Sequence, residues 1–413
     1  MIMSDQRGGL WKKLAVVGPA AIMVSSSMGP GTIASCMLGG SSEGYRLLWI
    51  VAASGFMGAA VCLLGGWVYA VTNKTPVEII EETVSNWVGY PLFVICGLAV
   101  YYVIIAEGNL LAHVTRLMVP SLGGINDTVI APLIILGIAI IFIFGFKRVV
   151  MLCSMFTGLM AVMFLVNLFF VDISWGDLLN GFIPSAPTSK YGFLALAGIL
   201  GGAAAGTNLV GYSYIVKNRG WDRPGFFPDM KRDQIFFYGI LFGLFSAGAF
   251  ISGAAVLYGR YIVRGATEAA IALEPMVGTA SLWFFLIGLF TAVFTTIGAF
   301  ATMVCYFFAD LFGLPPDLND SRFKIMLFIS IMLAVIGPFV GGFPAMQFVS
   351  LAMVGLLLAG IFFMGIYLYA ANSRKIMGEH TNGWIFNVIL GIIYLINLVF
   401  GLMAVVKVVS LFV

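Results

Sequence analysis

Small oxygen-bearing residues and glycines gather at two places where a long apolar segment of this chain is interrupted. The first interruption is Gly29-Pro30-Gly31, with Thr32 after it, and the second runs from Ala203 to Asn208. Hydroxyl groups, side-chain amides and free backbone carbonyls are hard oxygen ligands, which suit Mg²⁺, Ca²⁺ or Mn²⁺. The second interruption contains no cysteine, histidine or methionine, so it offers little to zinc, copper or iron. We therefore predict a site for a hard cation at these two places.

Both interruptions lie in segments, 14–38 and 191–216, that are long enough to cross a bilayer as one helix. Lipid cannot satisfy the backbone groups that a break releases, so such a break persists only where it lines a cavity or is covered by protein. The two segments stand five spans apart, as in inverted-topology repeats whose discontinuous helices meet at the substrate site. Two alternatives stay open. Gly29-Pro30-Gly31 is compatible with a plain kink, and Gly202 with Gly206 forms a GxxxG spacing that serves close helix packing.

The composition is that of a membrane protein, because 61% of the 413 residues are hydrophobic and only 9% are charged. Hydropathy and breaks together predict an all-α integral membrane fold with a single transmembrane domain over residues 1–413. Within it we expect repeat one at about 14–172, repeat two at about 191–372 and an extra helix at about 383–410. The eleven predicted spans are 14–38, 46–72, 90–118, 128–146, 149–172, 191–216, 235–259, 280–309, 323–342, 345–372 and 383–410.

The distribution of basic residues predicts the orientation, since cytoplasmic loops of membrane proteins carry an excess of Lys and Arg. With the N-terminus inside, fifteen of the 21 basic residues fall in cytoplasmic segments and six fall on the other side. We therefore expect a multi-pass protein of the cell membrane, with a cytoplasmic N-terminus and the C-terminus outside.

Sequence motifs of enzymes are absent from the chain. The five cysteines show no CxxC spacing, and no HExxH, Walker loop, nucleophile elbow or EF-hand pattern occurs. His113 lies near the end of the third predicted span and His380 lies in a loop, so no histidine relay crosses the membrane centre. We expect neither an enzyme nor a bound cofactor.

Glu107 is an ionisable residue placed inside the third predicted span. An ionisable group is costly at membrane depth and is by default a functional candidate, here as a negative charge beside a cation path. The alternative is a protonated or locally paired carboxylate that only ties helices together.

The first predicted span and the turn after it contain three short motifs: Gly18-Pro19-Ala20, Met28-Gly29-Pro30-Gly31-Thr32 and the turn from Gly44 to Trp49. These motifs resemble the first span and following turn of the Nramp divalent-metal transporters. The resemblance implies the LeuT-type 5+5 inverted-repeat fold, with helices 1 and 6 broken.

The chain departs from the Nramp pattern at the family's ligand positions. The family's first break reads Asp-Pro-Gly-Asn, and Gly29 and Thr32 stand here at the ligand places. We align its sixth-span motif Met-Pro-His with Gly206-Thr207-Asn208, and a second family histidine with Ser213. Of its Asp-x-x-Glu proton pathway only the glutamate remains, as Glu107.

This pattern resembles the prokaryotic Nramp-related magnesium transporters, which implies transport of Mg²⁺ and Mn²⁺ without proton coupling. The hypothesis is a transporter that imports partly hydrated Mg²⁺, and also Mn²⁺, by alternating access across the lipid bilayer. Backbone oxygens or space would come from Ser26, Gly29, Ala203 and Gly206. Thr32, Thr207 and Asn208 would hold the ion or its waters, and Glu107 would supply charge.

Two other functional classes remain open. One is a sodium-coupled amino-acid or small-solute symporter of the LeuT type, in which the positive helix end at Gly31 binds a carboxylate. The other is a membrane scaffold or receptor that keeps the fold without transport. The sequence leaves the oligomeric state undefined.

Overall fold

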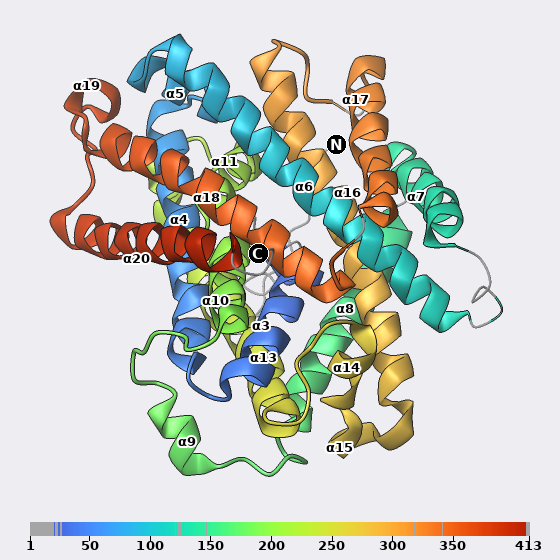
Figure 1. The fold of residues 1–413 in the computed structure, drawn as a ribbon. Coiled ribbons are helices and arrows are strands. Elements are labelled where there is room, and N and C mark those ends of the chain that lie inside the picture. Colours follow the sequence, from blue (N-terminus) through green and yellow to red (C-terminus); the bar gives the residue numbers. More distant parts are fainter. Residues whose placement is uncertain are drawn as a thin grey trace, which may run out of the picture.

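The computed structural model describes residues 20, 24, 27–119, 121, 126–145, 147–317, 319–340 and 342–409. Throughout these residues the regular structure is helical, with no strand (Figure 1). The helices of the first half are α3 (Pro30–Glu43), α4 (Leu48–Thr72), α5 (Pro76–Thr83), α6 (Asn86–Met118), α7 (Asp127–Ile143), α8 (Lys147–Asn167) and α9 (Trp175–Asn180).

The second half begins with a helix that is split in two. Its α-helices are α10 (Lys190–Ala203), α11 (Gly206–Arg219), α12 (Phe227–Asp233), α13 (Gly243–Leu257), α14 (Ala266–Ile271), α15 (Glu274–Val277), α16 (Ser281–Leu311), α17 (Ser321–Met332), α18 (Ala345–Asn372), α19 (Arg374–Met377) and α20 (Trp384–Val409). A π-helix over Gln234–Phe242 joins α12 to α13, and 3₁₀ turns lie at Pro224–Phe226, Gly278–Ala280 and Leu333–Phe339.

The predicted spans correspond closely to these helices. Within the described ranges, nine helical stretches are long and apolar enough to cross a membrane, and α7 is a shorter apolar helix. The remaining predicted span is the first one. Only its second part, α3, is described, and that helix runs on to Glu43. The all-α membrane fold is thus confirmed.

Several predicted boundaries were wrong by a few residues. The second span begins at Leu48, the fourth ends at Ile143 and the fifth ends at Asn167. The largest difference is at the seventh span, where a continuous helix begins at Phe227 and passes through the π-helix. Gln234–Phe242 is uniformly apolar except at its first residue, so hydropathy gives no sign of the change in helix type.

Both expected breaks exist, and local chemistry explains each of them. Helix α3 starts with Pro30 at its first position and with Gly29, in extended conformation, as N-cap. Proline lacks the N–H that would be unsatisfied there, and its fixed φ suits a helix start. In the second break Ala203 ends α10 and Ala204 is its C-cap, and Ala205 is extended (φ −66°, ψ 144°) before α11 begins at Gly206.

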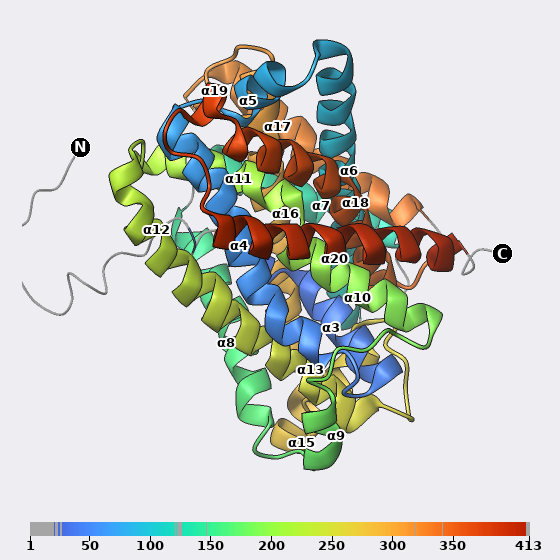
Figure 2. The same ribbon diagram turned by 90° about the vertical axis from the view of Figure 1, so that its left-hand side faces the viewer.

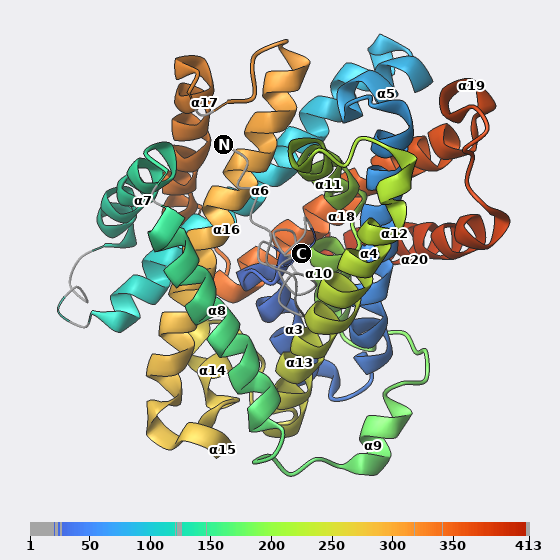
Figure 3. The same cartoon turned by 180° about the vertical axis from the view of Figure 1, so that it is seen from behind.

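The two broken spans lie at the centre of the molecule. The span formed by α10 and α11 is buried throughout its most apolar stretch, whereas α8 and α20 keep most of theirs on the outer surface. Figure 2 shows α20 crossing the outside of α10 and α18, and Figure 3 shows α8 along the opposite side. The apolar exposed faces of α8 and α20 are suited to lipid contact.

Candidate ion site at the two helix breaks

The first break is held by a hydrogen bond across the turn. The hydroxyl of Thr32, in the first turn of α3, donates to the carbonyl oxygen of Ser27 at 2.6 Å. Thr32 is buried. Ser26, which we predicted as a ligand, lies outside the described residues.

The second break is held by the side-chain amide of Asn208. Its Nδ2 donates to the carbonyl oxygens of Gly202 (3.2 Å) and Ala203 (3.0 Å), which end the α10 half-helix. These carbonyls carry the negative end of the helix dipole and would otherwise be unsatisfied. The predicted free carbonyl at Ala203 therefore already has a donor within the protein.

Tyr238, from the π-helix, joins the two breaks. Its hydroxyl accepts from Asn208 Nδ2 at 3.2 Å and lies 2.8 Å from Ser27 Oγ and 2.9 Å from the Ala203 carbonyl oxygen. A hydroxyl has one proton, so Tyr238 donates to Ser27 or to Ala203 and not to both at once. The predicted meeting of the two discontinuous helices is thus present as one hydrogen-bonded cluster.

Thr32 and Gly202 bring α3 and α10 into direct contact at this cluster. A Cβ added to Gly202 would lie 2.6 Å from the Thr32 hydroxyl oxygen, so only glycine permits this approach. Thr207 lies in the first turn of α11, where its buried hydroxyl has no hydrogen-bond partner among the described residues. An unsatisfied buried hydroxyl is costly and is available to an ion or its water.

Gly206 does not open space for an ion, contrary to one of our expectations. A Cβ at this position would overlap the carbonyl oxygen of Gly360 and would lie 3.0 Å from the backbone nitrogen of Met364. Gly206 therefore allows close backbone contact between α11 and α18. This is the packing alternative that the GxxxG spacing had left open.

The same geometry favours a different alignment of the sixth-span motif from the one we predicted, which placed Met-Pro-His on Gly206-Thr207-Asn208. Gly206 is the first residue of α11, as Pro30 is the first residue of α3. Proline is favoured at that position, so the motif Met-Pro-His fits Ala205-Gly206-Thr207 better than the segment one residue later. In this register the thioether position is Ala205, the first histidine position is Thr207 and the second is Tyr212.

A methionine from α18 lies against the two breaks. A Cβ on Gly31 would lie 2.9 Å from Met353 Sδ, and one on Gly202 would lie 3.9 Å from it. Met353 is buried. The site is therefore not purely oxygen-lined, because a soft thioether stands beside both half-helices.

Helix α20 also contributes to the second break. The side-chain amide of Asn397 donates to the carbonyl oxygen of Ala204 at 2.8 Å, and Asn397 is buried. The extra helix therefore satisfies a backbone group that the break releases.

Glu107 is fully buried in α6, and both its carboxyl oxygens lack a hydrogen-bond partner in the described part of the chain. An ionised carboxylate in such surroundings is costly, so a proton or a cation must compensate it. No described hydrogen bond or ion pair joins Glu107 to either break, so its role stays a prediction.

A cavity of about 270 Å³ reaches the cluster from the side of α8 and α16. Ser27 and Asn208 line its inner end, and Tyr214 and Tyr306 lie farther along α11 and α16. Hydroxyl groups of Ser154, Thr295 and Thr302 also lie on its wall. The cluster thus borders a mostly apolar chamber that carries a few polar groups on its wall.

Three contributors, Tyr238, Met353 and Asn397, were missed by sequence reasoning. Tyr238 and Met353 occur in apolar runs where tyrosine and methionine are ordinary packing residues. Asn397 did carry a signal, because it is an isolated amide within the apolar stretch 388–406. Polar residues in membrane helices commonly hydrogen-bond to a neighbouring helix.

Comparison with known proteins identifies relatives of the whole chain. Residues 20–407 match the family described as "Natural resistance-associated macrophage protein-like", Nramp. The "Divalent metal cation transporter MntH" of Nostoc sp. (strain PCC 7120) is 23% identical over 395 residues, covering 90% of this chain and 86% of the relative. The relatives of the same name from Levilactobacillus brevis and Latilactobacillus sakei are 26% and 27% identical, over 53% of this chain. This chain spans about half the length of those two relatives (48%).

Solved structures of similar fold include the manganese transporter of Eremococcus coleocola. One of its variants has a TM-score of 0.79 at 18% identity, covering all of this chain and 90% of that one. A complex of the same transporter with an aromatic bis-isothiourea compound has a TM-score of 0.78 at 19% identity. At this level of identity the likeness shows the fold alone.

Proposed function

This chain belongs to the Nramp family, and on that premise we propose that it imports a partly hydrated divalent cation, Mg²⁺ and also Mn²⁺, by alternating access. The observation that carries the proposal is the polar cluster of Ser27, Asn208 and Tyr238, where two helix breaks meet and which a cavity reaches. Its side chains are neutral oxygen and amide groups. Within the described ranges, no group of three or more His, Cys, Asp or Glu residues is arranged to hold a metal.

A neutral cluster favours an ion that keeps part of its water. Mg²⁺ dehydrates reluctantly and is usually bound through several retained waters. The free hydroxyl of Thr207 would hold the ion or a bound water, and Thr32 and Asn208 would do so after turning from their present partners. With no carboxylate at Gly29, the affinity would be modest.

The thioether of Met353 is the feature that would extend the substrate range to Mn²⁺. Mn²⁺ prefers oxygen ligands, as Mg²⁺ and Ca²⁺ do, but it tolerates softer donors better than those two ions. Relatives of this chain are named as divalent metal cation or manganese transporters. These names support a metal ion rather than an amino acid as the substrate.

Proton coupling is not part of the proposal. The Nramp pattern pairs an aspartate with the third-span glutamate, and Ile104 stands here in the aspartate place. An inside-negative potential can drive the uptake instead, since moving two charges inward gains about 4.6 kcal/mol per 100 mV. Glu107 would supply a fixed charge near the path, and the α9 and α15 end of the molecule would face outward.

Uptake into proteoliposomes tests the proposal. With an inside-negative potassium-diffusion potential and the same pH on both sides, we expect saturable Mg²⁺ and Mn²⁺ uptake without internal pH change. Uptake that requires an imposed pH gradient would contradict the uncoupled mechanism. Sodium-dependent uptake of a labelled amino acid, without metal uptake, would favour the symporter alternative.

Substitution of Thr207 ties the activity to this site. Thr207→Val removes the hydroxyl and keeps the volume nearly constant, so we expect a several-fold higher KM for both ions with little change in stability. Thr302→Val is the matched control, because that hydroxyl lies on the cavity wall and donates to its own helix at Gly298.

A further inference from the structure

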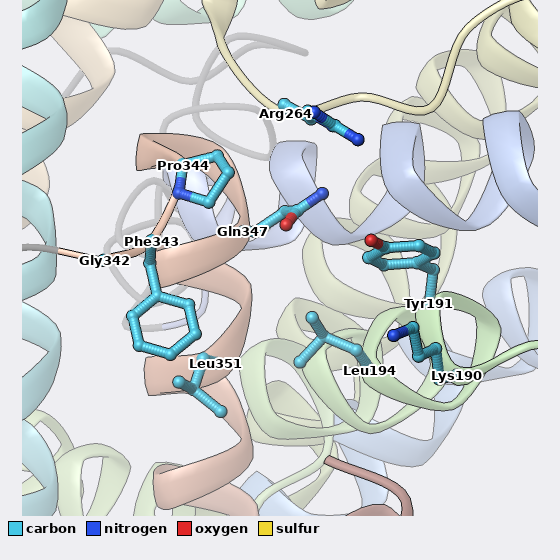
Figure 4. Close-up of a pocket in the computed structure, with 9 residues that line it drawn as sticks. All are labelled: Lys190, Tyr191, Leu194, Arg264, Gly342, Phe343, Pro344, Gln347 and Leu351. Carbon is cyan, nitrogen blue, oxygen red and sulfur yellow. The ribbon is translucent and has the colours of Figure 1, made fainter. Parts of the chain in front are cut away.

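A second cavity, of about 180 Å³, lies between the beginnings of α10 and α18 (Figure 4). Its charged lining residues are both cationic: Lys190, the first residue of α10, and Arg264, in the loop before α14. Tyr191 and Gln347 add a hydroxyl and an amide, and Figure 4 shows these two groups pointing toward one another across the space. Among the described residues, no carboxylate lines this cavity.

The cationic charge is uncompensated in the described part of the chain. No ion pair there joins Lys190 or Arg264 to an acidic side chain, and Lys190 lies 5.7 Å from the ring centre of Tyr191. Two carboxylates in neighbouring elements are already engaged. Glu43 accepts from Thr188 and Ser189, and Glu268 accepts from the backbone N–H of Gly265 at 2.8 Å.

The backbone adds further positive character. Helix α18 begins here at Ala345, and its N-cap, Pro344, offers no side-chain acceptor to the first turn. The amide of Gln347 donates to the carbonyl of Val263 at 3.1 Å, which fixes that amide at the cavity and leaves its second N–H available. Guanidinium, ammonium, amide and hydroxyl groups together form a donor set suited to an oxyanion.

The position of the cavity relates it to the ion path. Leu194 and Leu351 line it. Lys190 begins α10 and Ala203 ends it, so the cationic end of the cavity lies about 20 Å along the helix axis from the second break. Ser350, next to Leu351 in α18, forms a 3.2 Å hydrogen bond with Ser35 of α3. The cavity is thus an outer vestibule on the α9 and α15 side of the breaks.

We propose that Lys190 and Arg264 bind a small oxyanion, of the phosphate or carboxylate class, at the outer vestibule, and that this anion promotes divalent cation entry. The role in entry rests on the proposed transport function. Two free positive charges about 10 Å from an entering divalent cation lower its local concentration, by on the order of tenfold in dilute buffer and less in physiological salt. A bound oxyanion removes that repulsion.

Binding is tested first, on the purified full chain in nanodiscs of neutral lipid without metal. Titration with inorganic phosphate should raise the melting temperature saturably and broaden the phosphate ³¹P resonance, with chloride at equal ionic strength much weaker. Lys190→Gln combined with Arg264→Gln should abolish both effects. Arg260→Gln is the matched control, because that exposed arginine lies in the same loop and does not line the cavity.

Anionic-lipid nanodiscs distinguish the source of the oxyanion. If the wild type is stabilised in these nanodiscs without phosphate, and the Lys190→Gln and Arg264→Gln double variant is not, the bound oxyanion is a lipid head group. A response to phosphate that survives in the double variant, or no saturable response in either lipid, would overturn the proposal.

The effect on transport is measured as initial Mg²⁺ uptake at subsaturating concentration and low ionic strength. Phosphate outside should raise the wild-type rate about three- to tenfold, whereas the double variant should be fast without phosphate and unresponsive to it. Metal uptake that is indifferent to phosphate in the wild type would overturn the anion's role in entry. If no metal moves under any condition, the transport function fails, and the binding experiment still decides the anion site.

Discussion

The carboxylate of Glu43, in the last turn of α3, accepts hydrogen bonds from both the backbone N–H (2.8 Å) and the hydroxyl (2.7 Å) of Ser189. Ser189 is the N-cap of α10, so this contact joins the outer ends of the two half-helices that meet at the breaks. Thr188 donates to the same carboxylate through its N–H and its hydroxyl. The two half-helices are therefore fastened at both ends and are expected to move as one unit.

Removing this carboxylate should loosen the pair of half-helices. We expect Glu43→Ala to lower stability by about 2–3 kcal/mol, because several partly buried hydrogen bonds to a charged acceptor are lost. Thermal unfolding in detergent measures the effect. Arg46→Ala is the control: its guanidinium is half-exposed and lies 3.7 Å from Glu43, so a change below about 1 kcal/mol is expected. Equal losses in the two variants would contradict the fastening role.

Tyr238→Phe tests the link between the breaks. The variant keeps the ring and removes the hydroxyl that contacts Ser27, Ala203 and Asn208. We expect a stability loss of about 1–2 kcal/mol and a several-fold slower Mg²⁺ uptake, since Asn208 loses one of its three acceptors and Ser27 loses its partner. Tyr101→Phe is the control, because that hydroxyl bonds to Ser330 away from the breaks. Normal Mg²⁺ uptake by the Tyr238→Phe variant would show that the Tyr238 hydroxyl has only a structural role.

Met353→Leu tests the soft ligand from α18. Leucine has a similar volume and no sulfur, so the packing cost should stay below about 1.5 kcal/mol. If the thioether contacts the ion, Mn²⁺ uptake should fall several-fold while Mg²⁺ uptake changes little. Competition of Mn²⁺ with Mg²⁺ in proteoliposomes measures the ratio. The same substitution at Met346, two turns away on α18, should leave this ratio unchanged.

Gly206→Ala and Ala205→Met test the corrected register. A methyl group at 206 meets the Gly360 backbone, so we expect a loss of about 1–3 kcal/mol without a change in ion preference. A thioether at 205, the N-cap of α11, should instead shift preference toward Mn²⁺. Uptake ratios and melting temperatures separate the two effects. If Gly206→Met instead shifted the preference toward Mn²⁺ and left the stability normal, the family's methionine would align with Gly206, as we first predicted.

Glu107→Gln tests the fixed charge in α6. The variant removes an unpaired buried carboxylate, so stability should be unchanged or higher. Mg²⁺ uptake should fall about tenfold if the charge attracts the ion, and its dependence on pH should stay flat. Glu81→Gln, on the exposed side of α5, is the control. Unchanged uptake would leave Glu107 as a residue that only joins helices.

The sequence was sufficient to predict the breaks because their cause is local. Pro30 and its glycine neighbours define where α3 begins, whatever packs around it. The position of the spans followed equally from hydropathy. The residues that complete the site could not be predicted in this way, because Tyr238 and Met353 reach it from other spans. No periodicity in their own segments marks that contact. Gly206 shows the same limit, because the sequence cannot distinguish a glycine that leaves space for an ion from a glycine that permits close helix packing.

The π-helix over Gln234–Phe242 has a mechanical consequence for the seventh span. Its wide turns hold more residues than an α-helix needs, and Tyr238 lies in the middle of them. Rewinding by a single residue into α-helical pairing would turn that side chain by about 100° around the axis. The tyrosine would then leave Ser27 and Asn208, and the part of the span beyond it would rotate with it. A twist inside one helix, rather than a tilt of a whole bundle, is thus enough to release the two breaks from each other.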